Sequence, residues 1–283
     1  MPKVHAKFHS ARQCSGDCVM GKELLVVTGG ASGIGLACAK AMANQYKGVI
    51  LVDIDSEGLL AAKIALLDLC TNVLCYECDV ADHDAQIDLA DKIEREIGNV
   101  DALVTSAGVL NNSGTIMDMD IEEHARVWDV NYNGTVYSIR AFARGMSIRN
   151  RGAIVTIGSI NSFHPLPLPA YCPSKTAIMR VTQMLAVELG RNFIRVNGVA
   201  PTYVLSPAIK ARIESGDRDP DAIRKAGAIE MFVYPEDIAN VVSFLCSELA
   251  SAITGTMVPV DAGWEAATSY RTYVGGMPWA NNK

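Results

Sequence analysis

Tyr171 and Lys175 stand four residues apart and together have the chemistry to move a proton. On an α-helix this spacing places both side chains on one face. A free tyrosine has a pKa of about 10 and is a poor base at neutral pH, but a neighbouring ammonium stabilises its phenolate. Because the same spacing is common on amphipathic helices, the pair indicates catalysis only if the surrounding sequence also supplies a site.

A glycine-rich segment is the second chemical feature, with Gly29, Gly33 and Gly35 in a G-x-x-x-G-x-G spacing after an apolar run. Glycine permits a tight turn and lets the backbone approach a pyrophosphate, which the N-terminus of a following helix attracts. Asp53, at the end of the next apolar run, can accept hydrogen bonds from ribose hydroxyls and repels a 2′-phosphate. Since Ile54 follows it and the loop holds no basic residue, the pattern favours NAD over NADP as cofactor.

Short apolar runs alternate with helical patterns along the chain, and these elements must position the candidate residues. We expect strands over 24–28, 49–52, 73–78, 100–105, 153–157, 194–199 and 256–260, and helices over 34–44, 56–69, 85–96, 121–144, 171–189 and 235–248. Ser56 is the expected N-cap of the second helix. Strands that are apolar on both faces indicate an α/β, doubly wound parallel sheet of the Rossmann type, which binds ligands beyond the carboxyl ends of its strands.

The 283 residues are enough to bury one large core, and we expect a single domain over 22–263. Residues 1–21 read as a loosely ordered N-terminal extension, and residues 264–283 as a C-terminal tail rich in aromatic side chains. The long irregular stretch over 202–230 is typical of an active-site lid.

Composition and charge exclude several classes of partner. The net charge of −6 disfavours nucleic acid and anionic membranes, and no apolar run reaches the roughly 18 residues that a membrane span needs. The first twenty residues lack the apolar core of a secretory signal, so we expect a cytoplasmic protein with its eight cysteines reduced. Basic residues near the start weakly resemble a mitochondrial presequence, which stays an alternative.

Several motifs in order resemble the short-chain dehydrogenase/reductase superfamily in its core single-domain form, over roughly residues 22–263. They are T-G-x-x-x-G-I-G at Thr28–Gly35, Asp79-Val80, Ala107-Gly108, Asn131, Ser159, Tyr171 with Lys175, Arg195-Val196-Asn197, Pro201 and Asp261-Ala262-Gly263. The chain departs from the family pattern at Thr105 and Ser106, where two asparagines are usual, and at Thr202, where glycine is usual.

The resemblance implies a catalytic set of Asn131, Ser159, Tyr171 and Lys175, in which Asn131 holds a water that relays protons. It implies cofactor contacts from Gly29, Ser32, Gly33, Ile34, Gly35, Asp53, Asp79, Val80, Ser106, Ala107, Gly108, Tyr171, Lys175, Pro201, Thr202 and Val204. It implies substrate contacts from Ser159, Asn161, His164, Tyr171 and Tyr203. The family usually forms dimers or tetramers, and by resemblance we expect a homotetramer.

The expected reaction is reversible hydride transfer between NAD and a secondary alcohol or ketone. Mainly apolar residues after the fourth, fifth and sixth strands favour a cyclic, aromatic or medium aliphatic substrate, with a polyol or sugar alcohol as the alternative. A non-catalytic NAD-binding sensor or scaffold and a sugar-nucleotide epimerase are less favoured. No metal is expected, and we set aside zinc binding by His5, His9, Cys14 and Cys18.

Overall fold

The computed structural model describes residues 22–70, 72–110, 114–271 and 273–275. The predicted N-terminal extension, with its four histidine and cysteine candidates for zinc, and residues 272 and 276–283 of the C-terminal tail lie outside the described residues.

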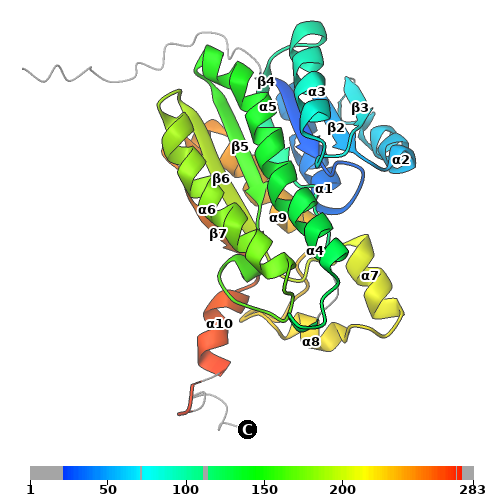
Figure 1. Ribbon diagram of the computed structural model, residues 1–283, viewed down its shortest axis with the longest axis vertical. Coiled ribbons are helices and arrows are strands. Elements are labelled where there is room, and N and C mark those ends of the chain that lie inside the picture. Colours follow the sequence, from blue (N-terminus) through cyan, green and yellow to red (C-terminus); the bar gives the residue numbers. More distant parts are fainter. Residues whose placement is uncertain (1–21, 71, 111–113, 272, 276–283) are drawn as a thin grey trace, which may run out of the picture.

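Seven parallel strands form one sheet in the order β3-β2-β1-β4-β5-β6-β7 (Figure 1). The strands are β1 (Lys22–Thr28), β2 (Tyr46–Asp53), β3 (Val73–Glu77), β4 (Val100–Thr105), β5 (Gly152–Ile157), β6 (Ile194–Pro201) and β7 (Met257–Val260). From β1 the strands are added outward in one direction as far as β3, and from β4 they are added in the opposite direction as far as β7. The boundary between β1 and β4 is the topological switch point, at which such folds bind ligands. The predicted doubly wound α/β fold is confirmed.

Helices cover both faces of this sheet. On one face lie α3 (His83–Glu96), α5 (Gly134–Arg149) and α6 (Tyr171–Gly190); on the other lie α1 (Gly33–Met42), α2 (Ser56–Leu66) and α9 (Pro235–Cys246) (Figure 1). Successive residues of a strand point to opposite faces, so Val26 packs with the first group and Val27 with the second. Two apolar layers therefore explain why the strand sequences are apolar without alternation.

Two predicted helices differ from the structure in their details. Helix α2 is capped by Asp55, whose carboxylate accepts a hydrogen bond from Gly58 N at 2.9 Å, so the prediction of Ser56 as N-cap was wrong. The helix predicted over 121–144 is divided into α4 (Ile121–Trp128), a π-helical segment (Asp129–Asn133) and α5. A π-helical turn widens the helix by one residue per turn and often marks a functional site.

The stretch after β6 contains two short helices, α7 (Pro207–Glu214) and α8 (Pro220–Arg224), so its description as irregular was only partly right. Each begins with proline behind a capping side chain, Ser206 for α7 and Asp219 for α8. The tail begins with α10 (Trp264–Arg271), which projects from the body in Figure 1. Short 3₁₀ turns complete the chain: η1 (Ala43–Gln45), η3 (Ile160–Ser162) and η4 (Glu248–Ala250). Within the described ranges, no helix has both the length and the apolar character of a membrane span.

Candidate active site

The glycine loop after β1 has the backbone that its sequence predicts. Gly29 has φ of +67° and Gly33 has φ of +53°, in the left-handed region that favours glycine. A Cβ on Gly29 would lie 2.6 Å from Ala107 N, so only glycine lets this loop pack against the end of β4. A Cβ on Gly35 would collide with the carbonyl oxygen of Gly29. Gly35 therefore lets α1 pack under the loop, and it does not line the cleft described below.

A cleft of about 510 Å³ opens at the carboxyl ends of the strands. Most of the predicted cofactor residues line it: Gly29, Ser32, Gly33, Ile34, Asp53, Asp79, Val80, Ser106, Ala107, Gly108, Tyr171, Lys175, Pro201, Thr202 and Val204. The predicted residues Ser159, Asn161 and Tyr203 line it as well. The fold thus brings the carboxyl ends of β1 to β6 and the lid to a single cavity.

Asp53 joins the end of β2 to the glycine loop. One of its carboxylate oxygens accepts a hydrogen bond from Ala31 N at 3.1 Å, and the other accepts one from Asp55 N at 3.2 Å. These bonds hold the carboxylate at the cleft wall with lone pairs remaining for a further donor. Farther along the wall, Arg126 pairs with Asp79 at 3.0 Å, at a residue that the family resemblance assigns to the cofactor.

Tyr171 is the first residue of α6, and Lys175 lies one helical turn later, next to the end of β5. The Nζ atom of Lys175 lies 5.5 Å from the centre of the Tyr171 ring and donates a hydrogen bond to Ile157 O at 2.8 Å. Ser159 lies beside the Tyr171 hydroxyl and favours its ionised form, which lowers the pKa of Tyr171. One phenol, one ammonium and one hydroxyl therefore meet at the same point of the cleft.

Burial dominates the ionisation of this group. It raises the pKa of Tyr171 to about 12, against the smaller lowering effect of the hydrogen bond with Ser159. Burial likewise lowers the pKa of Lys175 to about 8, because the charged ammonium loses hydration. The expectation that Lys175 lowers the pKa of Tyr171 is not met by the protein alone: the ammonium donates to Ile157 O, and burial is the largest effect on the pKa of Tyr171.

Asn131 lies in the π-helical segment and supports the cleft from behind. Its Oδ1 accepts a hydrogen bond from Val109 N at 2.8 Å, and its Nδ2 donates to Val109 O at 3.0 Å and to Ser174 Oγ at 3.3 Å. Thr135 Oγ1 donates to Asn131 O at 2.7 Å. Asn131 is fully buried and is not among the residues that line the cleft, so in this arrangement it anchors the loop after β4 and the start of α6.

The predicted substrate residue His164 is not brought to the cleft. Its ring packs edge to face on Trp264, and its Nε2 lies 3.5 Å from a carboxylate oxygen of Glu265. The loop after β5 turns this histidine toward α10, which the sequence had assigned only to a tail. By contrast, Asn161 lies on the short turn η3, two residues after Ser159, and faces the cavity.

Several cleft residues were missed by sequence reasoning. Arg126 comes from α4, and Ser206, Ile209, Arg212 and Arg218 come from the lid. A Cβ built on Gly33 would lie 4.0 Å from Ser206 Cβ, so the start of α7 lies directly over the glycine loop. The pair Ser206-Pro207, a capping residue followed by proline, is the signal that predicts this helix. Nothing in the sequence indicates the contact of Arg126 with Asp79.

The cleft residues fit a nicotinamide dinucleotide. The close-packed glycine loop offers backbone N–H groups, and the Asp53 carboxylate offers acceptors to a ribose. The hydroxyl of Thr202, just after β6, is buried without a hydrogen-bond partner among the described residues. A carboxamide group is able to bond to this hydroxyl, which suits the nicotinamide end of such a cofactor.

A family model described as enoyl-(acyl carrier protein) reductase matches residues 29–265. Galactitol 2-dehydrogenase of Rhizobium johnstonii is 35% identical over 245 residues, which cover 86% of this chain and 95% of that relative. Cis-4-hydroxycyclohexanecarboxylate dehydrogenase of Sinomonas cyclohexanicum is 32% identical and covers 87% and 97%. The family model covers the chain from the glycine loop after β1 to just beyond β7.

Solved structures give the same result. A short-chain type dehydrogenase/reductase from Mycobacterium ulcerans superposes with a TM-score of 0.81 at 29% identity, over 86% of this chain and 90% of the other. An NAD⁺-bound xylitol dehydrogenase superposes with a TM-score of 0.80 at 26% identity, over 86% and 100%. A protein named ElxO, with NADP bound, superposes with a TM-score of 0.81 at 26% identity, over 87% and 100%. Similar structures thus hold either nicotinamide cofactor.

Proposed function

Since this chain belongs to the short-chain dehydrogenase/reductase family and is an oxidoreductase that acts on CH–OH groups, we propose that it oxidises a secondary alcohol with NAD, using Tyr171 to transfer the proton. The observation that carries this proposal is the meeting of Tyr171, Lys175 and Ser159 at the end of β5, inside the cleft that fits a dinucleotide.

In the proposed mechanism Ser159 donates a hydrogen bond to the substrate oxygen and holds it beside the Tyr171 hydroxyl. When bound, the oxidised nicotinamide supplies the hydride acceptor, and its positive ring adds to the ammonium of Lys175 in favouring the phenolate. These positive charges lower the pKa of Tyr171 from the high value that burial gives it, so that Tyr171 can take the proton of the alcohol. Asn131 keeps the loop after β4 and the first turn of α6 in register around this exchange. In the reverse direction the same hydroxyl of Tyr171 returns the proton to the ketone.

The preference for NAD rests on Asp53. Its carboxylate is fixed at the cleft wall by Ala31 N and Asp55 N, where a 2′-phosphate would meet a charge of the same sign. The next residue, Ile54, is exposed and apolar, so no cation stands beside the carboxylate in sequence. Ribose hydroxyls are donors that this carboxylate accepts.

For the substrate we propose first a ring or medium aliphatic secondary alcohol, because Val109, Leu110, Leu166 and Leu168 form an apolar part of the wall. Relatives named for cis-4-hydroxycyclohexanecarboxylate and for levodione agree with that class. The polyol alternative is favoured by relatives named for galactitol and D-threitol.

The test is a screen of NAD⁺ and NADP⁺ reduction against matched ring, aliphatic and polyol alcohols, followed by absorbance of the reduced cofactor. We expect turnover with at least one secondary alcohol and a higher kcat/KM with NAD⁺. Cofactor binding without turnover of any alcohol or ketone would instead favour the sensor or scaffold function.

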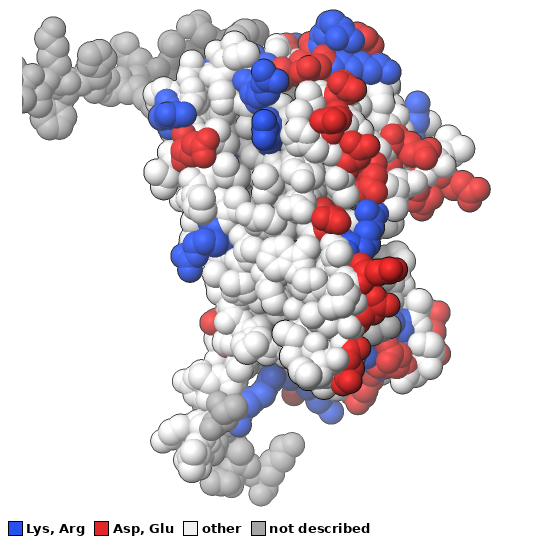
Figure 2. All heavy atoms as spheres, in the orientation of Figure 1, with Lys and Arg blue, Asp and Glu red and all other residues white. Residues whose placement is uncertain are grey.

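We also propose that the protein forms a homo-oligomer, a tetramer or a dimer, through the face of α5 and α6. Figure 2 shows few charged side chains over the middle of this face, while Asp and Glu gather along its edge beside α3 and α4. The apolar side chains of Ile148, Met184 and Val187 are exposed there. Light scattering after size exclusion tests the assembly, and Val187→Lys should lower the measured mass.

A further inference from the structure

The side-chain oxygen of Asn161 is buried and has no hydrogen bond among the described residues. The residue is 6% exposed, and its Oδ1 is fully buried without a partner. Among the described residues its Nδ2 also makes no hydrogen bond within the protein. Because buried polar groups in native proteins nearly always have a partner, this amide requires an explanation.

The backbone on either side of this amide is held firmly, so the missing bond is not a sign of local disorder. Asn161 N donates to Ser159 Oγ at 3.2 Å, and Thr176 Oγ1 donates to Asn161 O at 3.3 Å. The next residue, Ser162, donates its hydroxyl to Lys175 O at 2.7 Å. Turn η3 is thus tied to α6, and the amide is mounted on the same rigid support as Ser159 and Lys175.

Asn197 provides a contrast within the same protein. It is 1% exposed, its Nδ2 donates to Ile253 O at 2.8 Å, and its Oδ1 accepts a bond from Thr256 N at 3.2 Å. Asn197 therefore has the structural role expected of a buried asparagine, since it joins β6 to the segment before β7. Asn161 has the same burial and none of these bonds, and it faces the cleft instead.

An unpaired buried amide lowers the stability of the folded chain and is retained only if something else compensates. The compensation available here is a ligand group, because the amide lines the cavity that holds Tyr171 and Ser159. The Nδ2 group of this amide is a donor, so it complements the oxygen of a hydroxyl or of a carbonyl equally well. A simple alcohol with no second oxygen would leave the amide unpaired and would bind less well.

We propose that Asn161 is a specificity residue which binds a second oxygen of the substrate, so that the preferred substrate is a secondary alcohol with a hydroxyl or carbonyl on a neighbouring carbon. The neighbouring carbon follows from the placement of Asn161 beside Ser159, which positions the reacting oxygen. This inference rests on the proposed function. It predicts that ring alcohols and polyols are both substrates only if they carry a second oxygen on the carbon next to the reacting one.

The kinetic test uses two matched pairs of alcohols with the whole enzyme: vicinal cyclohexanediol against cyclohexanol, and vicinal butanediol against secondary butanol. The wild type should show a kcat/KM roughly tenfold higher for the diol of a pair, as loss of one hydrogen bond in a closed site implies. In Asn161→Leu the ratio of diol to simple alcohol should fall toward one. Turnover without a diol preference, or an unchanged ratio in the variant, overturns the proposed role of Asn161 and leaves the proposed function standing. Absence of all turnover overturns the proposed function.

The stability test does not depend on turnover. Asn161→Leu and the smaller Asn161→Ala remove an unpaired amide, so at least one of them should have a Tm equal to or above that of the wild type. The matched variant Asn197→Leu should have a Tm several degrees lower, because it leaves two backbone groups without partners. If both Asn161 variants lose as much Tm as Asn197→Leu, the amide is structural and the proposal is wrong.

Discussion

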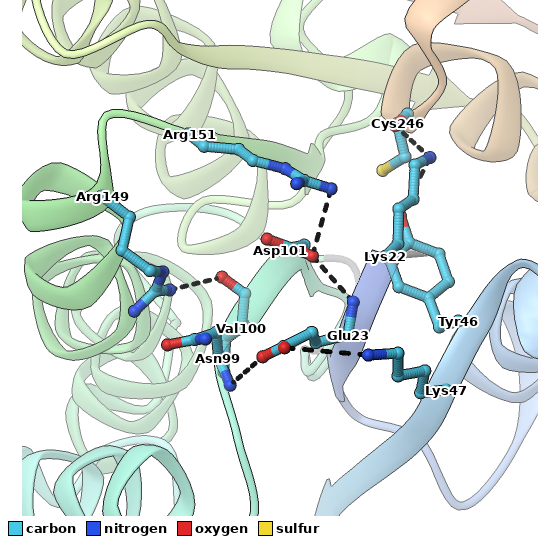
Figure 3. Close-up of polar contacts among 10 residues, drawn as sticks. All are labelled: Lys22, Glu23, Tyr46, Lys47, Asn99, Val100, Asp101, Arg149, Arg151 and Cys246. Carbon is cyan, nitrogen blue, oxygen red and sulfur yellow. Dashed lines mark hydrogen bonds and ion pairs between the residues drawn. The ribbon is translucent and has the colours of Figure 1, made fainter. Parts of the chain in front are cut away.

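At the amino ends of the strands, charged side chains bond to one another and to the backbone, whereas at the carboxyl ends several buried polar atoms have no partner. Figure 3 shows the amino edge. There, Asp101 accepts a hydrogen bond from Glu23 N at 2.7 Å and lies 3.4 Å from Arg151. Lys22 donates to Cys246 O at 2.9 Å. Each charged group drawn in this view has a partner inside the protein, although the Nε atom of Arg149 is itself buried without a hydrogen bond.

The carboxyl edge has a different pattern. The hydroxyls of Thr105 and Thr202 and the amide oxygen of Asn161 are buried without hydrogen bonds in the described part of the chain. Beside them, burial lowers the pKa of Lys175 to about 8 and raises that of Tyr171 to about 12. Both shifts disfavour the charged form of the side chain. The comparison teaches that one edge uses its polar groups for stability and the other reserves them for ligands. Identical substitutions at the two edges should therefore have different effects.

The largest difference is expected for tyrosine. Tyr171→Phe removes the proposed proton donor and acceptor, so kcat should fall roughly a thousandfold while Tm changes little. The matched variant Tyr46→Phe removes a buried hydroxyl that lies 3.5 Å from Lys22 at the amino edge, and it should leave kcat close to that of the wild type. Steady-state kinetics with the best alcohol of the screen measure both. A Tyr171→Phe enzyme with near-normal kcat would remove Tyr171 from the mechanism.

The next largest effect is expected for lysine, in the dependence of stability on pH. The pKa of Lys175 is about 8 when folded and about 10.5 when unfolded, so the buried ammonium destabilises the fold fully below pH of about 8. That difference corresponds to about 3 kcal/mol at neutral pH. The unfolded chain binds more protons between these values, so wild-type stability, measured relative to Lys175→Met, should rise from about pH 8 to about 10.5.

Denaturant unfolding of both proteins across this range measures the change. Loss of the hydrogen bond to Ile157 O shifts the variant by an amount that does not depend on pH, so the slope is the decisive quantity. Burial also lowers the pKa of Lys22 at the amino edge. Since Lys22 is only half-buried, Lys22→Met should give a slope of the same sign and smaller size. A flat difference for Lys175→Met contradicts the comparison.

The smallest effect is expected for aspartate. Asp53→Asn removes the charge that disfavours a 2′-phosphate, so the ratio of kcat/KM for NAD⁺ to that for NADP⁺ should fall by about tenfold. Asp101→Asn weakens the contact with Arg151, so it should lower Tm and leave the cofactor ratio unchanged. The two variants are compared by cofactor kinetics and thermal unfolding. An Asp53→Asn enzyme with an unaltered cofactor ratio would show that another group determines the preference.

Much of the fold could be predicted because its signals are local. Continuous apolar strands, glycines before a helix and a four-residue spacing of Tyr171 and Lys175 each depend on a few neighbouring residues. The strand limits agree closely; β4, for example, begins and ends where the sequence places it, at Val100 and Thr105. The π-helical segment around Asn131 was missed, because it depends on contacts with Val109 and Ser174, which are far away in the sequence.

The sequence by itself determined the class of sheet, the glycine loop and the side chains that meet at its carboxyl edge, because apolar runs, glycine spacing and helix periodicity are properties of the chain. Only the tertiary structure decided which of those side chains find partners. It turned His164 toward Trp264, left the amide of Asn161 unpaired, and set the pKa values of Tyr171 and Lys175 by burial. Burial and pairing depend on what surrounds a group in space, and that information exists only once the chain has folded.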